Sequence, residues 1–145
     1  MGKKLNRIKK TKVHAESKII KTTKIDDTRK VSFNFRRLHI KKDKFDYKEK
    51  DKNYFLKLIE RLQNVSLLTK RELETNRSNS LRCHPIDFKE CTECGFGLNL
   101  SEDIDLKAMQ FEISEHAHGR VHGFFITDVF YVVWLDPDHE LYSKK

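Results

Sequence analysis

The stretch that decides the fold consists of two apolar runs separated by a short polar step. The runs are Arg120-Val121-His122-Gly123-Phe124-Phe125-Ile126 and Val129-Phe130-Tyr131-Val132-Val133-Trp134-Leu135. We predict strands over residues 120–127 and 129–135 with a tight turn at Thr127-Asp128, because the runs are short and rich in β-branched and aromatic residues. Both strands are apolar on both faces, so the hairpin is expected at the centre of a sheet with helices packed on at least one face.

The other predicted elements lie upstream of this hairpin. Alternating apolar residues predict a strand over residues 31–38, and a short strand is expected over residues 110–114. Three- and four-residue spacing predicts a helix over residues 51–64 that begins after Asp51, with an apolar stripe of Tyr54, Phe55, Leu58, Ile59 and Leu62. Thr69 and Glu72 form a capping-box pattern that predicts a second helix over residues 69–74, and residues 75–107 are expected to be mostly loop.

This order of elements predicts an α+β fold. A strand, two helices and three further strands would form a small antiparallel sheet, with the two helices of the N-terminal half packed on it. The chain has 145 residues, which fits a single core. We therefore expect one α+β domain over residues 31–145.

The charge of the chain is concentrated in its first thirty residues. Residues 1–30 hold eleven Lys or Arg and three Asp or Glu, whereas the rest of the chain is balanced, in a chain of formal net charge +8. We predict a flexible basic arm over residues 1–30, because this segment lacks the apolar residues needed to offset its ordering entropy. The arm is either a solubilising tail or an electrostatic contact to RNA such as the ribosome surface.

Several locations are disfavoured by the sequence. The longest apolar run, residues 129–135, is far shorter than the roughly 20 residues of a membrane helix. No apolar segment follows the basic start, which argues against a secretory signal. The three cysteines are an odd number and include a Cys-x-x-Cys pair, so a reducing cytoplasm is the expected location.

The end of the chain carries a resemblance. The segment Gly119-Arg120-Val121-His122-Gly123-Phe124-Phe125-Ile126, the second apolar run and Asp136-Pro137-Asp138-His139-Glu140-Leu141-Tyr142 resemble the RelE/YoeB/ParE superfamily of bacterial toxins. They are more similar to small uncharacterised bacterial proteins that end in GRVHGF…FYxVWLDPxHxLY. The superfamily resemblance covers residues 31–142 in element order, and residues 119–142 in detail.

The resemblance implies a function. It implies a ribosome-dependent mRNA endoribonuclease of a bacterial toxin–antitoxin system, with RNA, the ribosome and a cognate antitoxin as partners and no membrane association. Members of the ParE type poison gyrase instead. Two features depart from the family, whose members are usually shorter and are basic around the cleavage site. In this chain, residues 83–145 hold five basic and twelve acidic residues.

Four residues are candidates for metal-independent RNA cleavage, which needs a base, an acid and a cation at one phosphate. Arg120 suits the phosphate, because a guanidinium binds it through two hydrogen bonds. His122 follows at strand spacing on the same face, and His139 and Tyr142 lie beyond the next strand. Each residue also has a structural alternative. Arg120 could form a salt bridge with Asp136 or Glu112, and His122 could be a hydrogen-bonded core histidine. His139 could belong to a turn, and Tyr142 could anchor the C-terminus.

The cysteines form a possible zinc site. Cys91-x-x-Cys94 followed by glycine is typical of a zinc knuckle, and Cys83 and His84 could supply the remaining ligands. His116 and His118 are alternative ligands. The competing interpretations are ordinary loop cysteines and a reactive thiol.

A basic stretch is a candidate nucleic-acid surface. It is interleaved with Phe45 and Tyr47, which could stack on bases, and its basic residues are Arg36, Arg37, Lys41, Lys42, Lys44, Lys48, Lys50 and Lys52. The first five are the predicted nucleic-acid-binding residues. A solvated surface is the alternative. The favoured function is the RelE-like endoribonuclease. The alternatives are a non-enzymatic nucleic-acid-binding module with a basic arm and a zinc loop, and a phage- or plasmid-encoded protein-interaction factor.

Overall fold

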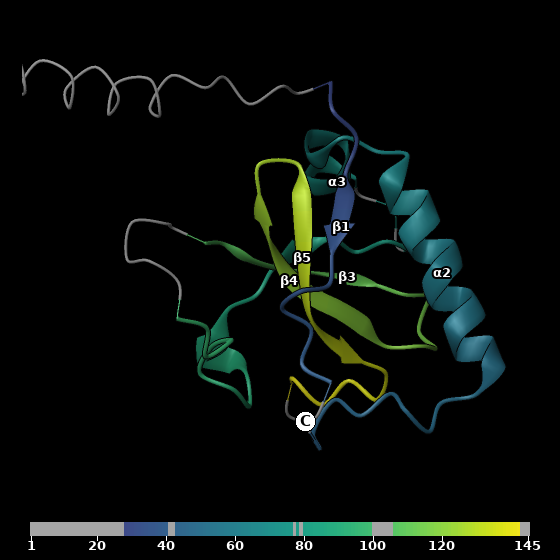
Figure 1. Ribbon diagram of the computed structural model, residues 1–145, viewed down its shortest axis with the longest axis vertical. Coiled ribbons are helices and arrows are strands. Elements are labelled where there is room, and N and C mark those ends of the chain that lie inside the picture. Colours follow the sequence, from purple (N-terminus) through teal and green to yellow (C-terminus); the bar gives the residue numbers. More distant parts are fainter. Residues whose placement is uncertain (1–27, 41–42, 77, 79, 100–105, 143–145) are drawn as a thin grey trace, which may run out of the picture.

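The computed structural model describes residues 28–40, 43–76, 78, 80–99 and 106–142. Two α-helices and a five-stranded sheet make up the fold (Figure 1). In chain order the elements are β1 (Ser32–Asn34), α2 (Lys52–Ser66), α3 (Lys70–Thr75), β2 (His84–Pro85), the 3-10 turn η1 (Phe88–Glu90), β3 (Ala108–Glu112), β4 (Arg120–Ile126) and β5 (Val129–Asp136). The predicted α+β class is confirmed. Of the flexible arm predicted over residues 1–30, residues 1–27 lie outside the described residues.

The β4–β5 hairpin lies inside the sheet, as predicted. The strand order is β1-β5-β4-β3-β2, so β4 and β5 both have neighbours on two sides. The hairpin closes with Ile126 opposite Val129, and Thr127 takes a left-handed φ of 55° in the turn. A β-bulge between His122 and Gly123 shifts the register, which twists the hairpin locally.

The first strand pairs in a way that the sequence pattern did not predict. β1 runs parallel to β5, with Phe33 opposite Phe130, whereas the other pairs are antiparallel. β1 is also shorter than the predicted strand over residues 31–38. It ends because the Asn34 side chain accepts a hydrogen bond from the backbone N–H of Arg36 and turns the chain away from the sheet.

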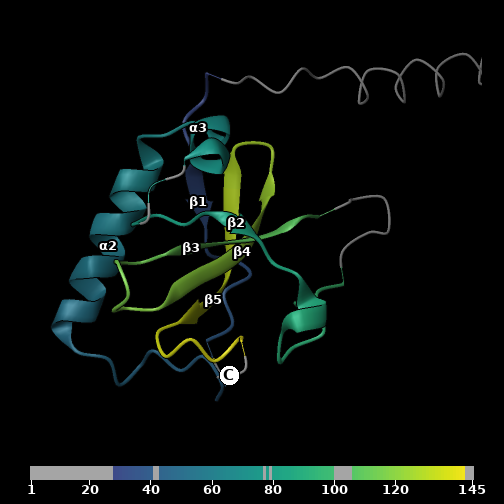
Figure 2. The same cartoon turned by 180° about the vertical axis from the view of Figure 1, so that it is seen from behind.

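The two helices begin where their capping residues predict. The Asp51 side chain accepts from the backbone N–H of Tyr54 at 2.9 Å, and Thr69 with Glu72 forms a complete capping box. Both helices pack on one face of the sheet (Figures 1 and 2). Their buried side chains join strand residues in an apolar core whose members include Leu58, Val65, Leu73, Phe111, Val121 and Phe130.

The predicted apolar stripe of α2 is only partly buried. Tyr54 and Leu58 face the sheet, whereas Phe55 and Ile59 are 37% and 62% exposed. The buried side of α2 also includes Val65, which follows Leu58 by seven residues, close to two full helical turns. Phe55 and Ile59 lie about 100° around the helix from that side, so the same spacing places them in solvent.

A second apolar core covers the opposite face of the sheet. Its buried members include Phe45, Phe124, Trp134 and Leu141, with Phe88 and Phe96 packed against them. Residues 84–98 form this cover, and they contain β2 and η1, so the prediction that residues 75–107 are mostly loop misses these two short elements. The missed strand has only two residues, too few to produce an alternation in the sequence.

The beginning of the described chain is tied to the domain before Val31. Arg29 forms an ion pair with Asp128, and Lys30 forms one with Glu72. Neither α-helix in the described part of the chain is long and apolar enough to cross a membrane.

Candidate functional site

Five polar side chains share the sheet face opposite the helices. Gln110 and Glu112 come from β3, Arg120 and His122 from β4, and Asp136 from β5. The register places Gln110 opposite His122, and Arg120 opposite both Glu112 and Asp136. All except the partly exposed Arg120 are buried. Because side chains alternate between faces along a strand, the same strands supply apolar residues to the helix side.

This polar row borders an open pocket of about 370 Å³. The pocket is lined by His84, Pro85, Asp87, Glu90, Arg120, His139 and Tyr142. Three of the four predicted catalytic residues, Arg120, His139 and Tyr142, therefore lie in one cavity. His122 does not line it.

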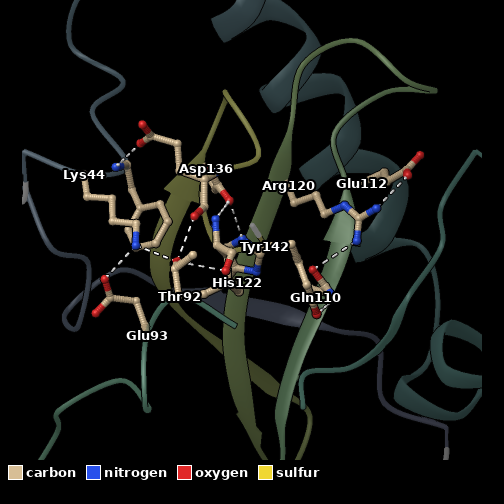
Figure 3. Close-up of polar contacts among 12 residues, drawn as sticks. Lys44, Thr92, Glu93, Gln110, Glu112, Arg120, His122, Asp136 and Tyr142 are labelled. Atoms are coloured by element: carbon tan, nitrogen blue, oxygen red, sulfur yellow. Dashed lines mark hydrogen bonds and ion pairs between the residues drawn. The ribbon is translucent and has the colours of Figure 1, made fainter. Parts of the chain in front are cut away.

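The Arg120 guanidinium is held from within the sheet. Its Nη1 donates to Gln110 Oε1 at 3.2 Å, and its Nη2 lies 3.5 Å from Glu112 Oε1 (Figure 3). Arg82 Nη1 lies at the same distance from that carboxylate oxygen. Two arginines therefore share the single buried carboxylate of Glu112.

Tyr142 is held by Gln110 and by the neighbouring loop. Gln110 Nε2 donates to Tyr142 Oη at 2.6 Å, and the Arg120 guanidinium lies 5.9 Å from the centre of the tyrosine ring. The backbone of Tyr142 forms an antiparallel bridge with Cys91. Burial, with a smaller contribution from the Cys91 thiol, raises the pKa of the Tyr142 hydroxyl, so it carries its proton at neutral pH.

His122 and Asp136 form a buried pair beneath the pocket. His122 is fully buried, and its Nε2 lies 3.2 Å from Asp136 Oδ2. Burial lowers the pKa of His122, against the attraction of Asp136, so the ring is neutral and donates from Nε2. Its Nδ1 is buried without a hydrogen-bond partner, which fits an unprotonated nitrogen. His122 is therefore placed as a hydrogen-bonded core histidine.

Asp136 also fixes the segment that carries His139 and Tyr142. Its two carboxylate oxygens accept from the backbone N–H groups of Glu140 and Leu141 at 2.8 and 3.0 Å. Burial raises the pKa of Asp136, but the hydrogen bonds from His122 and these two N–H groups outweigh it and hold the pKa below its ordinary value. The anion closes a turn in which His139 takes a left-handed φ of 57°.

A second loop holds the same segment from its other side. The hydroxyl of Thr92 donates to the carbonyl oxygens of Glu140 and Leu141, each at 2.9 Å, and its backbone N–H also donates to Leu141. The Glu140 side chain accepts from the backbone N–H of Phe45. The position of His139 and Tyr142 thus depends on residues far away in the sequence.

The four predicted zinc ligands do not come together. Cys83 is buried in the helix-side core, whereas His84 faces the pocket on the other side of the sheet, because neighbouring residues of a strand point in opposite directions. Cys91 is half-buried and Cys94 is exposed, and burial raises the pKa of the Cys91 thiol. Within the described ranges no three His, Cys, Asp or Glu side chains are grouped so that they could hold a metal ion.

The predicted nucleic-acid surface is only partly described. Arg36 and Arg37 are exposed at the edge of the sheet after β1. Lys44 is not free for a phosphate, because its Nζ contacts the Thr92 hydroxyl and the Glu93 carboxylate, the latter at 3.0 Å (Figure 3). Lys41 and Lys42 lie outside the described residues.

The catalytic prediction missed His84, which lines the pocket, and Gln110, which lies buried behind it. His84 was assigned only to the zinc hypothesis, and Gln110 was assigned no role. A signal for Gln110 was present, because Gln110 and Glu112 alternate with the apolar Met109, Phe111 and Ile113. Polar residues on one face of an otherwise apolar strand indicate a buried polar site when that strand is covered on both sides.

Comparison with known proteins found no matching family model, no similar curated protein and no similar solved structure. The resemblance to the RelE/YoeB/ParE toxins therefore stays a prediction.

Proposed function

We propose that the protein cleaves RNA in this pocket as a RelE-like toxin acting on mRNA at the ribosome, in the cytoplasm and under the control of an antitoxin. The observation that carries the proposal is the convergence of Arg120, His139 and Tyr142 in one open cavity. These residues supply a cation, an imidazole and a phenol. Together they meet the requirements of RNA cleavage without a metal ion.

The chemistry assigns one role to each side chain. His139 takes the proton of the ribose 2′-hydroxyl, whose oxygen attacks the adjacent phosphorus. Arg120 stabilises the negative charge that develops on the phosphate oxygens. The bond from phosphorus to the 5′-oxygen breaks, and Tyr142, whose raised pKa keeps it protonated, gives its proton to that oxygen. The products are a 2′,3′-cyclic phosphate and a free 5′-hydroxyl.

The pocket does not attract RNA by its own charge. Asp87 and Glu90 line it together with Arg120. Affinity for a polyanion must therefore come from cations outside the cavity, such as Arg36, Arg37 and the basic residues 1–30. This division of roles predicts that RNA binding depends on salt more strongly than the cleavage step does.

The decisive experiment measures cleavage of an mRNA by the purified protein in the presence of translating ribosomes. Replacing His139 by asparagine removes the imidazole, and asparagine tolerates the left-handed backbone of this position. We expect the rate of mRNA cleavage to fall about 100-fold or more. His116 is the matched control, because it has the same φ of 57° and is exposed outside the pocket.

Expression in bacteria provides the second test. The wild-type protein is expected to arrest growth, whereas His139→Asn and Arg120→Lys are expected to be harmless and His116→Asn to remain toxic. Intact mRNA with wild-type protein and ribosomes would exclude the endoribonuclease. RNA binding that survives His139→Asn but is lost without residues 1–30, with no cleavage by any variant, would favour the non-enzymatic binding module.

A further inference from the structure

Two carboxylates of the pocket have no part in the cleavage roles assigned above. Asp87 and Glu90 line the cavity together with Arg120, and they come from η1 and its capping residue. Among the described residues neither carboxylate forms an ion pair, whereas the Arg120 guanidinium is paired with Glu112. A cavity with one cation and two acceptor groups fits a ligand that carries both an anionic part and N–H donors.

The Asp87 side chain is held in one orientation before any ligand binds. Its Oδ1 accepts a hydrogen bond from the backbone N–H of Lys89 at 3.0 Å and so caps η1. Phe88 anchors this turn, because its ring packs edge-on against Phe96 and Trp134 at centroid distances of 5.3 and 6.4 Å. Within the described part of the chain, Oδ2 accepts no hydrogen bond, and Oδ1 keeps a second lone pair. Asp87 is therefore a fixed acceptor, which lowers the entropy cost of binding.

Carboxylate acceptors discriminate among the four RNA bases. Guanine presents two neighbouring donors on its Watson–Crick edge, N1–H and the 2-amino group, and one carboxylate can accept both. Adenine and cytosine place a donor beside an acceptor nitrogen on that edge, and the N3–H of uracil lies between two carbonyl oxygens. A carboxylate that approaches any of these three bases along that edge meets a lone pair, which disfavours them. Rings on which a base can stack are also present, because His84 and Tyr142 line the same cavity.

We propose that the pocket binds a guanine nucleotide, with Asp87 accepting from the base and Arg120 holding the 3′-phosphate. The cavity volume of about 370 Å³ lies in the range of small-molecule sites, roughly 300–1,000 Å³. Glu90, the last residue of η1, adds a second acceptor on the same side. The inference rests on the function proposed above, in which the RNA is then cleaved on the 3′ side of guanosine.

Binding of nucleoside 3′-monophosphates to the purified full chain tests the site without any cleavage. Guanosine, inosine and adenosine 3′-monophosphates are compared by isothermal titration calorimetry, with inorganic phosphate as the probe of Arg120 alone. We expect guanosine 3′-monophosphate to bind about tenfold or more tightly than the adenosine nucleotide, as for a hydrogen bond to a charged group. Inosine keeps N1–H but lacks the 2-amino group, so its nucleotide is expected to bind with an affinity between the two.

Asp87→Asn separates the contact with the base from the structure of the turn. Asparagine can still cap η1 through its side-chain oxygen, but it carries an amide nitrogen in place of the second carboxylate oxygen. The preference for guanosine over adenosine 3′-monophosphate is expected to disappear in this variant. Asp46→Asn is the matched control, because the Asp46 Oδ1 likewise accepts from the backbone N–H two residues on, that of Lys48, at 3.0 Å and outside the pocket.

The outcomes separate this site from the cleavage reaction. No binding of the three nucleotides, equal affinity of the wild type for any two of them, or a guanosine preference that survives in Asp87→Asn would overturn the proposal. The inosine comparison needs no variant, so it still decides if Asp87→Asn fails to fold. A protein that prefers guanosine 3′-monophosphate through Asp87 but leaves mRNA intact would refute only the endoribonuclease. Cleavage of mRNA without preference for guanosine would refute only the guanine site.

Discussion

The two faces of the sheet differ in what the same strands present to them. Toward the helices, β3, β4 and β5 offer apolar side chains such as Phe111, Val121 and Phe130, all fully buried. Toward the opposite face they offer, besides apolar side chains such as Phe124 and Trp134, the amide, carboxylate, guanidinium and imidazole groups beside the pocket. The comparison teaches that alternation along one strand can separate the groups that stabilise a fold from those available for chemistry.

The faces also differ in how completely their polar atoms are satisfied. In the described structure, the buried side-chain atoms without a hydrogen-bond partner are Glu112 Oε2, Arg120 Nε, His122 Nδ1 and Tyr54 Oη. The first three belong to the pocket face. Native proteins leave few such atoms, so three of them on one face distinguish that face from the helix-covered one.

The largest effect is expected from the helix-covered face. Phe111→Ala removes a fully buried ring that contacts Phe33 and Phe130, and we expect the free energy of unfolding to fall by about 3–5 kcal/mol. Urea denaturation at equilibrium measures the change. Phe55→Ala serves as the control, because this ring is 37% exposed on α2 and should cost less than about 1 kcal/mol. Similar losses in both variants would contradict the assignment of this core.

The second effect tests the pocket face. Asp136→Asn keeps the size of the side chain but removes the carboxylate that accepts hydrogen bonds from the backbone N–H groups of Glu140 and Leu141. We expect the free energy of unfolding to fall by about 2–3 kcal/mol. The amides of these two residues should also exchange with solvent faster. Asp138→Asn is the control on the same segment, because its side chain is 57% exposed and pairs only with Lys50 among the described residues. Unchanged amide exchange in Asp136→Asn would show that the segment is held by other contacts.

The third effect is the pH dependence contributed by His122. Its pKa is lowered in the folded protein from an ordinary value of 6.5, so below pH 6.5 the unfolded chain binds a proton that the folded protein excludes. Stability should therefore fall as the pH drops from 6.5 toward the folded pKa, by at most about 1.4 kcal/mol per pH unit. His122→Gln should reduce the slope of stability against pH in this range, whereas the exposed control His116→Asn should not. The same slope in wild type and His122→Gln would show that His122 does not resist protonation.

Asp136 acts in a separate and more acidic range. Its folded pKa lies below the ordinary value of 3.8, so its contribution is present above that value and is lost as the pH falls through the folded pKa. His122→Gln is expected to leave this second decline in place. Unfolding curves at several pH values separate the two contributions.

The smallest effect concerns the basic residues at the margin of the sheet. Lys44→Ala should lower stability by less than about 1 kcal/mol, as expected for a partly exposed ion pair with Glu93. It should change RNA affinity less than Arg36→Ala with Arg37→Ala, which should reduce the slope of affinity against salt by roughly 0.7 for each lost phosphate contact. An equal change in slope for Lys44→Ala would show that Lys44 leaves Glu93 to bind RNA.

Much of the fold could be predicted from local patterns. The hairpin at Thr127, both helix caps and the α+β order depend on residues close together in the sequence. The parallel pairing of β1 with β5 could not be predicted, because it joins Ser32 to Val129 and no local spacing specifies it. β2 was missed for a related reason, since its two residues are a strand only because they pair with Met109 and Gln110.

The candidate site was predictable only in part. Arg120, His139 and Tyr142 could be grouped from the sequence because a tight hairpin brings the end of β5 back beside the start of β4. The sequence did not show whether His122 is buried or lines the pocket. Its burial depends on distant residues such as Phe45, whose ring centre lies 6.3 Å from that of His122 in the second core. His84 reaches the pocket through an edge strand, and the alternation that marks Gln110 as a buried polar residue does not specify its contacts with Arg120 and Tyr142.

The pairing of β1 with β5 has a consequence for the order of folding. Among the described strands, β1 is synthesised first and β5 last. About a hundred residues separate the paired residues Ser32 and Val129. Closing so long a loop costs conformational entropy before any contact repays it, so non-local topologies of this kind fold slowly. Until β5 is present, the first strand has no partner, and its alternating apolar residues remain exposed to association with other chains.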